Sequence, residues 1–313
     1  MLNPKSISIG DGYHGCHGVI SIHQRLTGLK KLPLDCPAEE LQPGDVVHVE
    51  TPLNPTGLAR NLKAYAEKAH ARGAYLVVDA TFGPPPLQDP FAWGADIVMH
   101  AGTKYIGGHS DLLCGILAVS PARAKEGWWQ KLKEDRMYLG NVMGSMEGWL
   151  GIRSLRTLEV RVERQSYNVG KLVGWLYAAL HPEKESSVSD MATLSSAISK
   201  IVRDVVSNVQ HASLQEEDLK EGWLKKQMPN GFGPVFAISM KTEELARRLP
   251  SKLALFHHAT SLGGVESLIE WRTMTDRTVD TRVLRISVGI EGWEDLRDDL
   301  LNGFKALAEE LHS

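Results

Sequence analysis

Two charged side chains follow short apolar runs of the sequence and could act together chemically. Asp79 ends the run AYLVVD, and Lys104 follows the run ADIVMH within the segment HAGTKYIGGHSD. A lysine that bonds covalently to a carbonyl compound needs small neighbours and a lowered pKa. An aspartate that faces a pyridine nitrogen keeps this nitrogen protonated. The pair therefore fits pyridoxal-phosphate chemistry, although ion pairs at strand ends are common and the same residues could form one.

Alternating strands and helices position this pair in the first half of the chain. Strands are predicted at 6–10, 29–34, 45–51, 74–79, 95–100 and 112–120, and helices at 13–28 and 62–73. The strands on either side of the second helix are continuous apolar runs, which is typical of parallel sheets that are covered on both faces. Ligands bind at the carboxyl ends of such strands, where Asp79 and Lys104 occur.

The second half of the chain is more helical. From residue 143 onward, apolar residues recur at three- and four-residue spacing, and a closing amphipathic helix is predicted at 293–313. Further strands are predicted at 232–241, 253–261 and 283–289, and a polar loop at 182–190. We therefore expect an α/β fold: a mainly parallel sheet with helices on both faces, plus a smaller α+β C-terminal domain. The expected domains are 1–150 and 151–313.

The composition excludes several kinds of partner. The formal net charge is −3 without a long basic run, so neither nucleic acid nor an acidic membrane is an expected partner. No apolar run approaches the roughly eighteen residues of a membrane span, and the N-terminus lacks the apolar core of a secretion signal. The three cysteines have no paired spacing, which predicts reduced thiols and a cytoplasmic protein.

The histidines do not form a recognisable metal site. Three pairs lie close enough in the sequence to be considered: His14 with His17, His100 with His109, and His257 with His258. None has the cysteine or carboxylate spacing of a zinc site. We therefore expect no metal.

Long parts of the chain resemble one enzyme family. The segment VVDATFGPPPLQDPFAWGADIVMHAGTKYIGGHSD is similar to the pyridoxal-phosphate signature of the Cys/Met-metabolism enzymes, which include cystathionine γ-synthases, cystathionine lyases, methionine γ-lyases and O-acetylhomoserine sulfhydrylases. The resemblance continues upstream through VHVETPLNPTG and downstream through SLGGVESLI and LRISVGIEGWEDLRDDL. It implies an aspartate-aminotransferase-like architecture (fold type I), pyridoxal 5′-phosphate as the cofactor, and a homodimer or homotetramer.

The resemblance also assigns roles around the cofactor. Lys104 would hold the cofactor covalently and shuttle protons, and Asp79 would pair with the pyridine nitrogen. Thr103 would bind the cofactor phosphate through its hydroxyl. Tyr13, in GDGYHG, would stack on the ring and assist the leaving group, and Asn54, in ETPLNP, would lie near the cofactor hydroxyl and the substrate.

Two further residues would bind the substrate. Arg285, in LRISVG, would hold the α-carboxylate with its guanidinium fork, and Ser261, in SLGG, would assist it. The residue before SLGG is Thr260, where several cystathionine-handling members of the family carry a glutamate for the distal amino group. This difference weakens the case for cystathionine as the substrate.

Other departures from the family pattern concern the cofactor. The family usually has HSATKY where this chain has HAGTKY, so Ala101 replaces a phosphate-binding serine. Ala80 replaces an asparagine, and Asp276 replaces a histidine. The family also has an earlier segment with an intersubunit arm and a phosphate-binding turn, which this chain is expected to lack. We therefore expect the chain by itself to bind the cofactor loosely.

Two functional hypotheses follow from the resemblance. The first is a pyridoxal-phosphate enzyme that catalyses γ-replacement, or γ- or β-elimination, on a sulfur amino acid or an O-acyl-homoserine, in the manner of cystathionine γ-synthase. The second is a non-catalytic homologue that acts only as a folded subunit. Ala101 and the expected missing segment favour the second hypothesis. The first is favoured by the retained residues Lys104, Asp79, Thr103, Tyr13 and Arg285.

Overall fold

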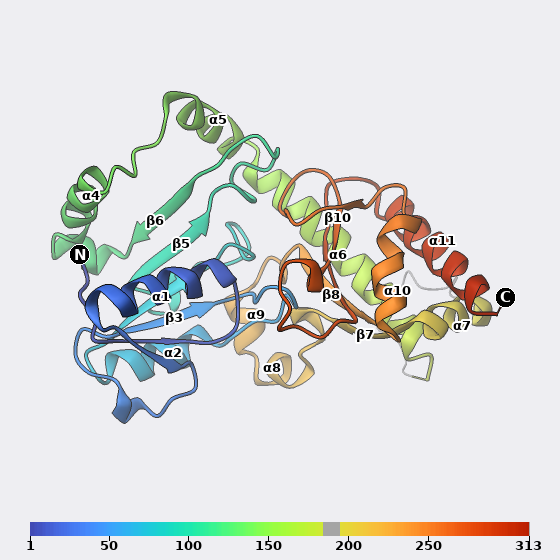
Figure 1. The fold of residues 1–313 in the computed structure, drawn as a ribbon, viewed down its shortest axis with the longest axis horizontal. Coiled ribbons are helices and arrows are strands. Elements are labelled where there is room, and N and C mark those ends of the chain that lie inside the picture. The colour runs from blue at the N-terminus through green and yellow to red at the C-terminus, as the bar shows by residue number, and fades with distance from the viewer. Residues whose placement is uncertain (184–194, 313) are drawn as a thin grey trace. The chain divides into compact units, whose positions relative to one another are not determined.

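The chain forms two compact units in a computed structural model that describes residues 1–183 and 195–312 (Figure 1). The first unit comprises Met1–Asn54, Ala59–Leu158 and Glu217–Asn230, and the second comprises Pro55–Leu58, Glu159–Glu216 and Gly231–Ser313. Most of the predicted loop at 182–190 lies outside the described residues. Within the described residues, no helix combines the length and the apolarity that a membrane span requires.

The first unit is built on a six-stranded sheet with the order β2-β1-β3-β4-β5-β6. All neighbouring strands are parallel except β6, which runs antiparallel to β5. The strands are β1 (Ser6–Ile9), β2 (Lys30–Pro33), β3 (Val46–Glu50), β4 (Tyr75–Asp79), β5 (Ile97–Ala101) and β6 (Gly115–Val119). The helices are α1 (His14–Thr27), α2 (Leu62–His70), α3 (Pro121–Lys125), α4 (Trp128–Tyr138), α5 (Ser145–Leu155), most of α8 (Glu216–Glu221) and α9 (Trp223–Gln227).

Helices cover both faces of this sheet. Because side chains alternate along a strand, one face carries Val78 and the other carries Ile9. Helix α2 buries Leu62 and Ala66 in the cluster that contains Val78, and α1 buries Ile20 against Ile9. The predicted fold class of this part of the chain, a mainly parallel sheet with helices on both faces, is confirmed.

The second unit is an α+β structure around a five-stranded sheet with the order β7-β8-β11-β10-β9. Only β9 and β10 are parallel. Its strands are β7 (Val206–Gln210), β8 (Val235–Met240), β9 (His257–His258), β10 (Leu268–Trp271) and β11 (Val283–Ser287), and its helices are α6 (Leu158–Leu180), α7 (Ser196–Val205), α10 (Glu243–Arg248) and α11 (Trp293–His312). Its core joins Leu172 of α6, Phe236 of β8, Leu284 of β11 and Phe304 of α11.

Two predicted strands are shorter than expected because side chains bind their backbones. Strand β6 begins at Gly115, since the backbone of Cys114 pairs with the Thr103 hydroxyl and not with a strand. The predicted strand at 253–261 is reduced to β9, because the Asp299 carboxylate accepts hydrogen bonds from the backbone of Ala254, Leu255 and Phe256. A backbone amide that binds a side chain is no longer available to a sheet.

Candidate active site

The carboxyl ends of β3, β4 and β5 bring the first unit's candidate residues to one edge of the sheet. Glu50 ends β3 and lies directly opposite Asp79, which ends β4. Lys104 lies in the turn that follows β5. This is the edge at which ligands bind in parallel sheets, as the sequence predicted for Asp79 and Lys104.

Asp79 is a buried carboxylate with one oxygen available. Its Oδ1 accepts hydrogen bonds from the Thr81 amide (3.0 Å) and hydroxyl (2.6 Å), and that hydroxyl in turn accepts from the Ala101 amide (2.9 Å). Its Oδ2 accepts none from the described residues, and only 4% of the residue is exposed. Burial raises the pKa of Asp79, and the Thr81 hydrogen bonds oppose this only in part.

The Lys104 turn has a closely packed backbone. The Lys104 amide donates to Ala101 O (2.9 Å), and its own carbonyl accepts from the Gly108 amide (2.7 Å). Gly102 has no room for a side chain, since a Cβ there would collide with Cys114 Sγ. We expected small neighbours so that a flat ring could approach the lysine, but the turn's own packing already requires glycine at this position.

The Thr103 hydroxyl, which the sequence suggested as a phosphate ligand, is engaged within the turn. It donates to Cys114 O at 3.3 Å and accepts from the Cys114 amide at 3.0 Å. The hydroxyl proton would have to rotate away from Cys114 O before it could bind a phosphate oxygen. Its assignment as a phosphate ligand stays a prediction.

Glu50, which we did not single out in the sequence, joins two of the predicted residues. Its Oε2 accepts from the Tyr13 amide and its Oε1 from the Asn54 amide, both at 2.7 Å. The ring of Tyr13 is half exposed, so it can contact a ligand. Burial and the nearby Asp79 charge raise the pKa of Glu50 to about 7, while the two amides and Arg60 lower it.

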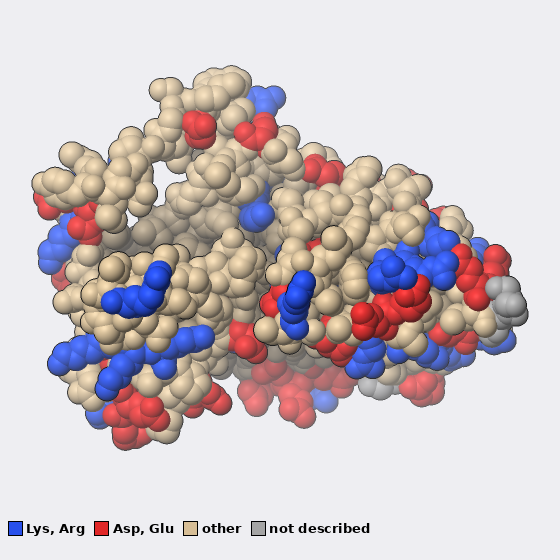
Figure 2. Space-filling view, in the orientation of Figure 1, with Lys and Arg blue, Asp and Glu red and all other residues tan. Residues whose placement is uncertain are grey.

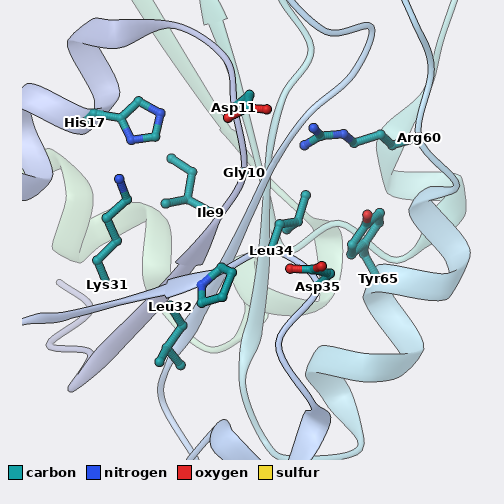
Figure 3. A pocket seen from close by; sticks show the side chains of 11 residues that line it. Ile9, Gly10, Asp11, His17, Lys31, Leu32, Leu34, Asp35, Arg60 and Tyr65 are labelled. Atoms are coloured by element: carbon teal, nitrogen blue, oxygen red, sulfur yellow. The ribbon is translucent and has the colours of Figure 1, made fainter. Parts of the chain in front are cut away.

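A cavity of about 580 Å³ lies beside the Tyr13 segment, at the carboxyl ends of β1 and β2 (Figure 3). Figure 3 shows the Arg60 guanidinium directed toward the Asp11 side of the cavity, and the ends of His17 and Lys31 directed toward each other. Neither Arg60 nor Lys31 forms an ion pair with a described residue. Arg60 nevertheless acts on Glu50, because its charge lowers the pKa of that carboxyl.

In the second unit, Arg285 lies in a buried charge network on neighbouring strands. Its Nη2 donates to Glu270 Oε2 (2.6 Å) and to the carbonyls of Thr260 (2.6 Å) and Ser261 (3.1 Å). Glu270 also accepts from Arg272 Nη1 at 3.0 Å. Arg285 and Ser261 are therefore in contact, as a shared substrate-binding role requires, but Glu270 was not predicted.

The donor set of the first unit fits pyridoxal phosphate. A primary amine follows β5, and a buried carboxylate with an available oxygen ends the neighbouring strand. The raised pKa of Asp79 shows that its ionised form lacks a compensating cation, which a protonated pyridine nitrogen would supply. Lys104, Asp79, Thr103, Tyr13 and Asn54 would hold the group.

Solved structures define the class of fold. CalE6, a methionine gamma lyase from Micromonospora echinospora, matches with a TM-score of 0.79 and 30% identity over 97% of this chain and 77% of that chain. The cystathionine gamma-lyase from Lactobacillus plantarum, complexed with L-serine, matches with a TM-score of 0.80 and 25% identity over 97% and 77%. The architecture is that of the fold type I pyridoxal-phosphate enzymes.

Sequence comparison identifies the family within this class. The chain belongs to the Cys/Met metabolism PLP-dependent enzyme family, whose model matches residues 35–305. It is 35% identical to cystathionine gamma-lyase of Dictyostelium discoideum, 34% to cystathionine gamma-synthase of Escherichia coli and 33% to a cystathionine beta-lyase of Lactococcus lactis, over 81–83% of this chain. The chain spans 61–63% of the length of these relatives.

Proposed function

We propose that the chain carries the catalytic site of a pyridoxal-phosphate enzyme for γ-replacement, or γ- or β-elimination, on a sulfur amino acid or an O-acyl-homoserine. The observation that carries the proposal is the juxtaposition of Asp79 and Lys104 at neighbouring strand ends. Membership of the Cys/Met metabolism family supports it. When bound, pyridoxal phosphate supplies an electron sink for negative charge at the substrate's α-carbon.

Each residue of the first unit has a defined task in this proposal. Lys104 Nζ holds the cofactor and moves the proton at the substrate α-carbon. Asp79 Oδ2 would accept a hydrogen bond from the protonated ring nitrogen and keep that nitrogen charged, because a buried carboxylate gains most from a cationic partner. Tyr13 covers the ring, Asn54 orients it, and Thr103 binds its phosphate.

In the second unit, Arg285 and Ser261 bind the substrate's α-carboxylate. The guanidinium suits a carboxylate because its N–H groups form a planar fork. Glu270 and two backbone carbonyls hold Nη2 of this guanidinium in place. The substrate is a small amino acid, and the reaction resembles that of cystathionine γ-synthase. The named relatives include a synthase and two kinds of lyase at nearly equal identity, so the comparison supports the reaction class rather than one member.

A second candidate function is a non-catalytic subunit. Ala101 favours it, because the methyl group cannot replace a phosphate-binding hydroxyl. Loss of one hydrogen bond to a charged group weakens binding by about tenfold or more. A colourless protein that binds no pyridoxal phosphate would favour this function over catalysis.

The direct test is covalent labelling of Lys104. The protein is incubated with pyridoxal phosphate, reduced with borohydride, digested and mapped by mass spectrometry. We expect the reduced label on Lys104 and not on Lys68, whose amine is committed to the Leu34 carbonyl (2.9 Å). Lys104→Ala should carry no label. A label on other lysines with Lys104 unmodified would overturn the assignment.

We also propose that the protein is cytoplasmic and self-associates. The cysteines are free thiols, which fits a reducing compartment. Much of α5 and of the segment before it is uncharged surface in Figure 2. The exposed apolar side chains there and at the end of α4 are Met137, Tyr138, Leu139, Val142, Met143, Met146, Trp149, Ile152 and Leu155. Apolar patches of this kind mark interaction sites, so sedimentation should reveal a dimer or tetramer.

A further inference from the structure

Glu50 binds the backbones of two separate loops. One loop follows β1 and carries Tyr13; the other follows β3 and carries Asn54. Each carboxylate oxygen accepts a hydrogen bond from one backbone amide. Both N···O distances are 2.7 Å, which is typical of a charged acceptor. An ionised carboxylate is the one common side chain that offers two acceptors and no donor at this spacing.

The neighbouring backbone is shaped to admit this carboxylate. Gly12 has a φ of +151°, a value that residues with a side chain rarely adopt. A Cβ at Gly12 would also collide with Glu50 Oε2. The glycine therefore lets the Tyr13 amide approach Glu50 closely, which explains the small residue in GDGYHG.

The charges around Glu50 show that its burial is costly. Asp79 faces it from β4 and raises its pKa, whereas the Arg60 charge from the loop before α2 lowers it. From α1, the Cys16 thiol faces both carboxylates, and its own pKa is raised to about 12 by burial, by Asp79 and by Glu50. A carboxylate that served packing alone could be replaced by an apolar side chain at lower cost.

We propose that Glu50 is a positioning residue that sets the place of Tyr13 and Asn54 relative to each other through their backbone amides. The inference rests on the proposed function, in which these two residues contact the cofactor. The proposed role requires no contact between Glu50 and cofactor or substrate. It acts by holding the two loops that do, and this role lies outside the residues that the sequence assigned.

The primary test needs no cofactor. Amide hydrogen exchange is measured by mass spectrometry on peptides covering residues 11–14 and 51–54, in the wild type, in Glu50→Gln and in Glu50→Leu. Glutamine keeps one acceptor and leucine keeps none. We expect both segments to exchange about tenfold to a hundredfold faster in Glu50→Leu, the range for loss of a hydrogen bond to a charged acceptor, and Glu50→Gln to lie between.

Asp45 supplies the matched control. It is also a buried carboxylate of this sheet, and it accepts backbone hydrogen bonds from Lys5, Ser6 and Gln42 at the opposite edge. Asp45→Leu, which like Glu50→Leu removes both acceptors, should accelerate exchange at residues 5, 6 and 42 and leave 11–14 and 51–54 unchanged. Equal exchange of the Tyr13 and Asn54 segments in the wild type and Glu50→Leu would overturn the proposal.

A second variant guards against misfolding of Glu50→Leu. Gly12→Ala leaves the charge of Glu50 intact but displaces its Oε2 from the Tyr13 amide, so the 11–14 segment alone should exchange faster. In the presence of cofactor, Glu50→Leu should weaken pyridoxal-phosphate affinity about tenfold while borohydride still labels Lys104. If the two segments exchange faster in Glu50→Leu but borohydride does not label Lys104 in the wild type, the positioning role is retained and the proposed function is rejected. Unchanged cofactor affinity in Glu50→Leu would reject the positioning role.

Discussion

The buried carboxylates Glu50 and Asp79 of the first unit and Glu270 of the second unit have different charged neighbours. Glu50 and Asp79 of the first unit lie opposite each other, and neither forms an ion pair with a described residue. Glu270 of the second unit is enclosed by the guanidinium groups of Arg272 and Arg285. Glu270 is thus compensated by two guanidinium groups of its own unit, whereas Glu50 and Asp79 are not, although the Arg60 charge lowers the pKa of Glu50.

Because of this difference, substitutions of these carboxylates should affect stability and function differently. Removing an uncompensated carboxylate relieves repulsion, so stability should change little and function should be lost. Removing a compensated carboxylate leaves its partners buried without a counter-charge, so stability should be lost directly.

The largest effect is expected for Asp79→Asn. The asparagine oxygen can keep the Thr81 hydrogen bonds, but a neutral amide does not hold the ring nitrogen in its protonated form. Turnover with an O-acyl-homoserine or a sulfur amino acid should fall by about 10² to 10⁴-fold, with cofactor retained and the melting temperature unchanged or raised. The matched control is Asp89→Asn, an exposed cap of a short 3-10 helix, which should retain turnover. Near-normal turnover in Asp79→Asn would show that Asp79 has only a structural role.

Glu270→Gln should be the most destabilising of these substitutions. It removes the counter-charge that Arg272 and Arg285 share, and each of them has less than 6% of the residue exposed; Arg272 retains Asp276 at 3.8 Å. Breaking a buried pair in this way costs about 3–5 kcal/mol. Hydrogen exchange of peptides covering β10 and β11 should report this loss in the second unit. Wild-type protection there would show that the network contributes no net stability.

The first unit should lose stability as the pH rises from about 4.5 to about 7. The pKa of Glu50 is about 7 in the folded protein and near 4.5 when exposed, so the folded form keeps its proton longer than the unfolded form. The stabilisation from protonated Glu50 is therefore present at low pH and is lost as the pH approaches 7. The raised pKa of Asp79 changes the free energy of unfolding with pH in the same direction. The effect of Glu50 is on the order of 3 kcal/mol. Urea unfolding followed across this range should show the decline, and Glu50→Gln should flatten it; a decline of equal size in both would assign it to other groups.

The smallest effect is expected at the exposed pair of Asp280 and Arg282. Both side chains are more than two-fifths exposed, although the carboxylate accepts a guanidinium hydrogen bond at 2.7 Å. Solvent screens such pairs, so Asp280→Asn should cost less than about 1 kcal/mol, measured by the same exchange experiment as Glu270→Gln. A cost equal to that of Glu270→Gln would show that burial does not distinguish the two pairs.

Sequence reasoning predicted the six strands and helices α1 and α2 of the first unit, but not α3, α4, α8 or α9, and it predicted the placement of the unit's two central residues. Apolar runs that end in charged residues predicted that Asp79 and Lys104 follow neighbouring strands, and the structure places both there. Glu50 was missed because the run DVVHVET reads as a buried strand throughout. Its role depends on the amide of Asn54, four residues away, together with the amide of Tyr13, which is 37 residues away in the sequence. The roles of all the site residues, Asp79 and Lys104 included, stay predictions, as does the domain division at residue 150.

The sequence by itself determined the family, the parallel sheet and the residue types at the site, because periodicity and motif order are local properties. Tertiary structure alone decided which buried charges are compensated. Glu270 meets Arg285 only because β10 and β11 pair in one register, and Glu50 faces Asp79 only because β3 and β4 pair in another. Electrostatic energy depends on the distance between charges and on their burial, and neither quantity is encoded in spacing along the chain.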